Sequence, residues 1–166
     1  GLGDVYKRQS PTEQTSGLII SILLIQIVAI GGALGFTKLA QRFGNILVLT
    51  IAIFLWGAVC VYAYFIYSPD QFYLIAGLVG LLMGGTQTVA RATFSLFIPQ
   101  TSDTTSFFSF YDVTEKIGIF FGLLFYAFAA QITGTVRFSV IIFMFFFFLG
   151  AILLTRVPKI DRKKLA

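Results

Sequence analysis

The residues that could do chemistry are concentrated in two short stretches of an otherwise apolar sequence. They are Gln87, Thr88 and Arg91 in the first stretch, and Asp112, Glu115 and Lys116 in the second. Because residues three or four apart share one face of a helix, each group can present its polar atoms to a common space. Such a space could hold a polar solute or carry a proton, and Asp112 could also pair with Lys116 on its own helix.

The groups used by most enzymes and metal sites are scarce. The sequence contains no histidine, and Cys60 is its one cysteine. This excludes a disulfide framework, zinc sites with histidine ligands, Ser-His triads and Cys-His pairs. The 12 basic and 7 acidic residues form no patch that could follow phosphates, which argues against nucleic acid as a partner. We therefore expect no enzyme, no cofactor and no metal.

The composition predicts an integral membrane protein. Of the 166 residues, 57% are hydrophobic and 11% are charged, whereas soluble domains average about 45–50% and about 25%. A bilayer core requires about 20 apolar helical residues for each crossing. Charge-free runs of that length, without the alternation of a membrane strand, predict an all-α, polytopic membrane helix bundle. Its five predicted helices are 17–38, 45–67, 71–97, 107–131 and 136–156.

Polar residues are distributed unevenly over these helices. The second and fifth hold no ionisable side chain away from their ends, whereas the third and fourth hold the two polar stretches. The first contributes Gln26. A charge at the bilayer centre costs at least about 2.5–3.5 kcal/mol, so it normally faces a partner or a wet cavity. We expect the first, third and fourth helices to border a polar interior, and the other two to shield it.

Each polar group also has a purely structural interpretation. Arg91 lies near the end of its helix and could extend to the membrane interface. Asp112 and Glu115 come early in theirs, where acids complement the helix dipole, and Lys116 could neutralise them. Gln26 could simply hydrogen-bond a neighbouring helix. The sequence leaves both interpretations open.

Glycine pairs predict close packing of the three polar helices. They are Gly31 and Gly35, Gly80 and Gly84, and Gly118 and Gly122. Small residues four apart let two helix backbones approach closely. By contrast, Trp56 and Cys60 on the second helix are expected to pack or to face lipid.

The segments outside the helices predict the orientation. Residues 1–16 form a polar segment, of which 1–9 resemble translated adapter sequence, and residues 159–166 form a basic tail. Five crossings place the tail on the same side as the loop after the first helix, and Lys and Arg are in excess there. Cytoplasmic loops carry this excess, so the C-terminus is expected in the cytoplasm. Because residue 1 is not methionine, we expect the chain to be part of a longer one.

The segment GALGFTKLAQRFGN, residues 32–45, resembles the inter-helix motif of the major facilitator superfamily. The matching positions are Gly35, Leu39, Arg42 and Gly44. Gln41 replaces the usual acid and Asn45 the first of the trailing basic pair, which fits the degenerate copy in the second half of such transporters.

Three later segments are similar to the vacuole-effluxer-like branch of that superfamily. They read GGTQTVARATFSLFIP (84–99), SFFSFYDVTEKIG (106–118) and GLLFYAFAAQITGTVRFSV (122–140). The matching residues are Gln87, Arg91, Pro99, Phe107, Phe108, Tyr111, Lys116, Thr133, Gly134 and Arg137. A Gly-Pro usual after the lysine is Gly122-Leu123 in this sequence.

The resemblance implies that the five helices are the last five of a twelve-helix transporter, with the missing N-terminal half on the same chain. In that architecture the eighth, tenth and eleventh helices face the central cavity. They correspond to the first, third and fourth predicted helices, which the distribution of polar residues independently assigns to a polar interior. It implies secondary active transport of a small polar solute, such as an amino acid, by alternating access. Fungal relatives are expected to export amino acids from the vacuole.

In such a transporter, Arg91 would hold an anionic group or close a gate, with Gln87 and Thr88 as hydrogen-bonding neighbours. Asp112, Glu115 and Lys116 would exchange partners between states, and one carboxylate would carry a coupling proton. The expected location is the bilayer of a bacterial inner membrane. The alternative is a non-transporting multi-pass subunit or scaffold, in which the polar residues only hold helices together.

Overall fold

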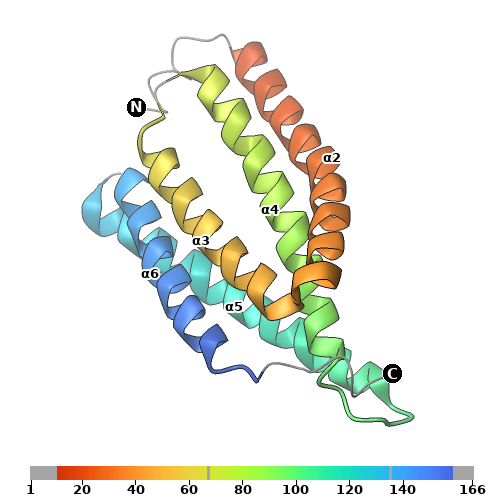
Figure 1. Cartoon of the computed structure of the whole chain (residues 1–166). Helices are drawn as coiled ribbons and strands as arrows, with labels where there is room; N and C mark the ends of the chain where they lie inside the picture. The colour runs from red at the N-terminus through yellow and green to blue at the C-terminus, as the bar shows by residue number, and fades with distance from the viewer. Residues whose placement is uncertain (1–10, 67, 135, 159–166) are drawn as a thin grey trace.

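A computed structural model of the chain describes residues 11–66, 68–134 and 136–158. Within this part of the chain all regular secondary structure is helical, and five helices follow one another (Figure 1). They are α2 (Pro11–Phe43), α3 (Asn45–Tyr64), α4 (Pro69–Ser95), α5 (Thr104–Thr133) and α6 (Val136–Thr155). The predicted all-α helix bundle is therefore confirmed. The helix α2 begins at residue 11 instead of 17, and α5 begins at 104 instead of 107.

The helix ends have local causes in the sequence. Gly44 separates α2 from α3 with a φ of 95°, a conformation that residues with a side chain rarely adopt. Ser68 caps α4 through a capping box, in which its hydroxyl accepts from the Gln71 N–H and the Gln71 side chain accepts from the Ser68 N–H. Asp103 caps α5 by accepting from the Ser106 backbone N–H at 3.1 Å and from its hydroxyl at 2.6 Å. This cap explains the early start of α5, because it satisfies amide groups of the first turn.

The described helices have the length and apolarity of membrane spans. Four of them are long and apolar enough to cross a bilayer: Thr15–Phe43, Asn45–Tyr64, Asp70–Ser95 and Thr104–Ile132. A shorter apolar stretch, Ile142–Thr155, lies in α6. Large apolar side chains lie exposed on their surfaces, such as Ile27, Phe54 and Phe120. An exposed apolar surface on long helices suits hydrocarbon as the surrounding medium, and the chain is a multi-pass membrane protein.

The closest packing joins α2 to α4, which lie side by side in Figure 1. A Cβ added at Gly84 would lie 2.1 Å from the carbonyl oxygen of Ala29, and one added at Gly80 would lie 2.5 Å from that of Ile25. The close approach predicted for Gly80 and Gly84 is therefore confirmed. The contacting glycine of α2 is Gly32, whose added Cβ would lie 2.1 Å from the Leu81 carbonyl oxygen.

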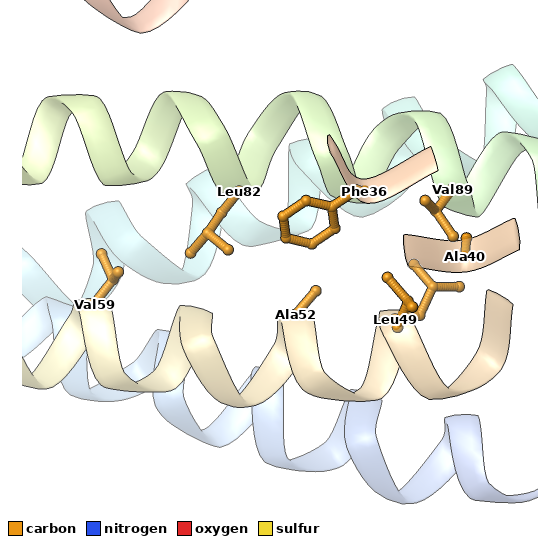
Figure 2. Close-up of a cluster of buried hydrophobic side chains, with 8 residues drawn as sticks. Phe36, Ala40, Leu49, Ala52, Val59, Leu82 and Val89 are labelled. Atoms are coloured by element: carbon orange, nitrogen blue, oxygen red, sulfur yellow. The ribbon is translucent and has the colours of Figure 1, made fainter. Parts of the chain in front are cut away.

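The helix α3 joins this pair to α6. Its inner face packs against α2 and α4 in a cluster of buried apolar side chains (Figure 2). The cluster comprises Phe36, Ala40, Val48, Leu49, Ala52, Val59, Leu82 and Val89. Trp56 extends the contact in two directions, because its Nε1–H donates to the Thr86 hydroxyl at 3.1 Å and its ring stacks on Phe147 of α6 at 5.7 Å. Trp56 is thus a packing residue that ties three helices together.

The helix α5 is the most loosely held. Within its most apolar stretch 6% of the residues are buried, against 33% in α4. It packs along α6 through ring contacts, such as Tyr126 with Phe143 at 5.5 Å, and it meets α4 where α4 ends and α5 begins (Figure 1). Gly118 and Gly122 of α5 have no neighbouring atom within 4 Å of an added Cβ, so their predicted close packing is not made here.

Candidate functional site

A salt bridge joins the end of α4 to the beginning of α5. The Nη2 of Arg91 donates to Oδ1 of Asp112. Both side chains remain about half exposed, at 53% for Arg91 and 49% for Asp112. Neither charge of the pair is therefore fully buried.

Aromatic rings surround the arginine in this salt bridge. The guanidinium carbon of Arg91 lies 6.0 Å from the ring centre of Phe108 and 5.8 Å from that of Tyr111. Phe94 of α4 contacts the same two rings, at 6.1 Å and 4.9 Å between ring centres. A cation over an aromatic face gains electrostatic stabilisation from the ring quadrupole. We call these five residues, Arg91, Phe94, Phe108, Tyr111 and Asp112, the Arg91 clasp.

The local sequence explains why the clasp forms at this level. Arg91 and Phe94 are three residues apart, so they share one face of α4 in its last two turns. Phe108, Tyr111 and Asp112 are three and four apart and share one face of α5 in its first turns. The chain reverses between them, and Asp103 fixes where α5 starts. The pKa of Asp103 lies below its usual value, because the hydroxyl and the backbone N–H of Ser106 both donate to its carboxylate.

The other predicted site residues lie outside the clasp, and their side chains are largely accessible. Gln87 and Thr88 lie about one turn before Arg91 on α4, and both are exposed. The Thr88 hydroxyl donates to the Gly84 carbonyl at 2.8 Å within its own helix. Gln26 of α2 is also exposed.

Glu115 and Lys116 lie on α5 about one turn after Asp112. Glu115 is half-buried and Lys116 is exposed. Asp112 makes its salt bridge with Arg91 of the neighbouring helix, and among the described residues none links it to Lys116. The partner of Asp112 is therefore on α4 and not on α5.

The inter-helix motif lies at the junction of α2 and α3, separate from the clasp. Gly44 makes the break between the two helices, and Leu39 and Gly35 lie exposed on α2. Arg42 is exposed and places its guanidinium carbon 5.4 Å from the ring centre of Phe43. Gly35 has open space around an added Cβ.

Three aromatic members of the clasp were not identified as functional residues from the chemistry of the sequence. Phe108 and Tyr111 were named only as matches to the family motif, and Phe94 was not named as a candidate. Their spacing could have indicated them, since Phe94 follows Arg91 by three residues and Phe108 precedes Asp112 by four. Across the described residues, no three acidic, cysteine or histidine side chains cluster as a metal site would require.

A bundle of long apolar helices, with an ion pair between two of them, is typical of multi-pass membrane transporters. The family model described as "Vacuole effluxer Atg22 like" matches residues 5–165. The chain therefore belongs to the vacuole effluxer Atg22-like family, as the motifs predicted. No solved structure matches the chain.

Named relatives from bacteria and fungi agree with this membership. An "Uncharacterized MFS-type transporter YxiO" of Bacillus subtilis (strain 168) is 33% identical over 145 residues, which cover 87% of this chain and 34% of that protein. "Autophagy-related protein 22" of Eremothecium gossypii is 32% identical over 96 residues, covering 58% of this chain and 18% of that protein. The protein of the same name from Saccharomyces cerevisiae (strain ATCC 204508 / S288c) is 32% identical over 94 residues, covering 57% and 17%. The chain thus spans about a third of the bacterial relative's length and about a sixth of the fungal ones'.

Proposed function

We propose that this chain forms part of a secondary active transporter that moves a small polar solute by alternating access, with the Arg91 clasp as its gate. The observation that carries this function is the salt bridge between Arg91 and Asp112, which holds α5 to α4 although α5 is otherwise loosely packed. A half-exposed ion pair between a well-packed helix and a loose one can open at low cost. The rest of the bundle need not unpack when it does.

The clasp suggests how the solute acts. A guanidinium binds carboxylates in a planar, two-pronged geometry, so a solute with a carboxylate can compete with Asp112 for Arg91. Gln87 and Thr88, exposed about one turn away, supply further hydrogen bonds. Amino acids satisfy these requirements and are the first class to test.

A proton can couple to the same step. Protonation of Asp112 removes the negative charge that holds Arg91 and leaves the guanidinium free for the solute. Glu115, on the same face of α5, is the second candidate proton carrier, and Lys116 can balance the charge left on either acid. Gln26 of α2 contributes a further amide to the polar path.

Membership of the family supports a wider setting for this proposal. Further helices of the same chain would supply the opposite wall of the cavity, and the location would be a bacterial inner membrane with the C-terminus in the cytoplasm. The five helices by themselves are then not expected to transport.

The competing function is a non-transporting membrane subunit or scaffold. The ring contacts among Phe94, Phe108 and Tyr111 favour it to the extent that they hold α4 to α5 without any solute. In that case the clasp is only a packing element.

Replacement of Arg91 in the longer chain separates the two functions. Amino-acid flux is measured in proteoliposomes for Arg91→Ala and Arg91→Lys, with Lys38→Ala as the matched control that removes an exposed cation outside the clasp. A transporter loses flux in both Arg91 variants while it inserts and folds normally, and keeps it in the control. Loss of assembly with Arg91→Ala, or no flux above that of empty liposomes in the unsubstituted protein, would favour the scaffold. Unchanged flux in both Arg91 variants would show that Arg91 is not part of the gate.

A further inference from the structure

A groove runs between α3 and α6 on a part of the surface that the Arg91 clasp does not use. Its wider section has a volume of about 710 Å³ and lies where α2 meets α3, opposite the end of α6. Its narrower section has a volume of about 190 Å³ and lies deeper along the same two helices. Phe54 lines both sections, so they adjoin each other along α3.

The walls of the groove are those of a binding site for a hydrocarbon chain. The deeper section is lined by apolar side chains of both helices, among them Ile53, Met144 and Phe148. Gly57 forms part of its wall, and a Cβ added there would meet no atom within 4 Å. The missing side chain of Gly57 therefore leaves room for an occupant.

Two arginines are sequence neighbours of residues that line the mouth of the groove. Arg42 immediately precedes the lining residue Phe43 and lies over its ring, and Arg156 lies between the lining residues Thr155 and Val157. Both arginines are exposed, and none of the described residues that line the wider section is acidic. The mouth is also the start of α3, which has no side-chain cap and no acid in its first turn. All these features favour an anion at the mouth.

The membrane setting identifies what combines an anion with a hydrocarbon chain. The span Asn45–Tyr64 contains no Asp, Glu, Lys or Arg, which suits an outer face in lipid with its end near the headgroups. We propose that the groove binds an anionic glycerophospholipid. The phosphate lies at the mouth between Arg42 and Arg156, and an acyl chain extends past Phe54 over Gly57. A free phosphate would leave the apolar section empty, and an apolar helix would leave the arginines without a counterion. This assignment does not depend on transport.

Retained lipid provides the test. The chain is reconstituted in nanodiscs with equal amounts of phosphatidylglycerol and phosphatidylcholine, extracted in mild detergent, and its bound lipids are counted by native mass spectrometry. The wild type is expected to retain phosphatidylglycerol preferentially. One basic residue near the surface changes the binding of anionic lipid about fivefold, so Arg42→Gln and Arg156→Gln should each lower the preference by about that factor. Equal retention of the two lipids by the wild type, or an unchanged preference in both variants, would overturn the assignment.

The acyl chain is tested separately at Gly57. Gly57→Phe fills the deeper section and should lower the retention of both lipids. Gly31→Phe is the matched control, since Gly31 on α2 also has open space and does not line the groove. If thermal unfolding shows that Gly57→Phe is misfolded, Gly57→Leu replaces it. Equal retention in the Gly57 and Gly31 variants, or displacement of phosphatidylglycerol by millimolar inorganic phosphate, would contradict a lipid site.

Discussion

The strength of the Arg91 clasp can be measured with a double-mutant cycle. The variants are Arg91→Ala, Asp112→Ala and the two combined. Exposed ion pairs contribute about 0.2–1 kcal/mol, and hydrogen bonds between membrane helices average about 0.6 and reach about 1.7 kcal/mol. Because both side chains are about half exposed, we expect a coupling free energy of about 1 kcal/mol between them.

The single variants should differ because the arginine has additional partners. Arg91→Ala also removes two cation–π contacts, each worth about 0.5 kcal/mol at an exposed site, so it should destabilise the chain by about 2 kcal/mol. Asp112→Ala removes the ion pair alone and should cost about 1 kcal/mol. The double variant should resemble Arg91→Ala, since the ion pair is already lost there.

Trp56 provides the assay. It is the one tryptophan of the sequence, and its contacts with Thr86 and Phe147 make its fluorescence sensitive to the packing of α3, α4 and α6. Unfolding is followed by titrating mixed micelles with a denaturing detergent. A coupling below about 0.3 kcal/mol is the value found for independent sites and would refute a direct interaction between Arg91 and Asp112.

Three further predictions concern the parts of the fold that position the clasp. Gly84→Ala should destabilise the chain by about 1–3 kcal/mol, because the added Cβ meets the Ala29 backbone. The matched variant Gly31→Ala should stabilise it by up to about 1 kcal/mol through helix propensity alone. If thermal unfolding shows stability changes of the same sign for the two variants, the close approach at Gly84 is contradicted. Trp56→Phe should lower the free energy of unfolding, followed by circular dichroism, by about 0.6 kcal/mol. Adding Thr86→Val to this variant should cause no further loss, because the hydrogen bond between the two side chains is already gone. Additive losses from the two substitutions would exclude that hydrogen bond. The first-turn amides of α5 should lose protection against hydrogen exchange, measured relative to the intrinsic rate at each pH, as the pH falls through the lowered pKa of Asp103, below its ordinary value of 3.8. The carboxylate stabilises the turn above that range, and its hydrogen bonds from Ser106 weaken when it is protonated. Asp103→Asn should reduce this acid response, and an unchanged response would show that the cap does not control the turn.

The sequence was sufficient for features that depend on local pattern. Five helices, their order and their apolar character followed from charge-free runs. Local sequence also accounts for the helix boundaries that the structure shows at Gly44, Ser68 and Gly134. The family followed from ordered motifs over the last three helices. Each of these signals is contained within a few neighbouring residues.

The contacts between helices were harder to predict from the sequence, because they depend on the rotation and register of each helix. Spacing alone offered Lys116 as the partner of Asp112, while the structure pairs it with Arg91, 21 residues away in sequence. Spacing also singled out Gly31 and Gly35 on α2, whereas Gly32 faces α4. A pattern of small residues identifies a helix that can pack closely, but not the face that does so. The roles of the polar residues stay predictions for the same reason, since a solute path depends on what lies opposite them.

The distance between the ends of α4 and α5 tests the gating role of the clasp most directly. Spin labels are attached at Ala92→Cys and Ser109→Cys, two exposed positions beside the clasp, in the complete transporter proposed above, with Cys60→Ser. Pulsed electron spin resonance is recorded with and without a transported amino acid. A gate predicts two distance populations, with the longer one increasing when the solute is present or when Arg91 is replaced by alanine. A single distance that stays the same in all these conditions, while the protein still transports, would contradict the account.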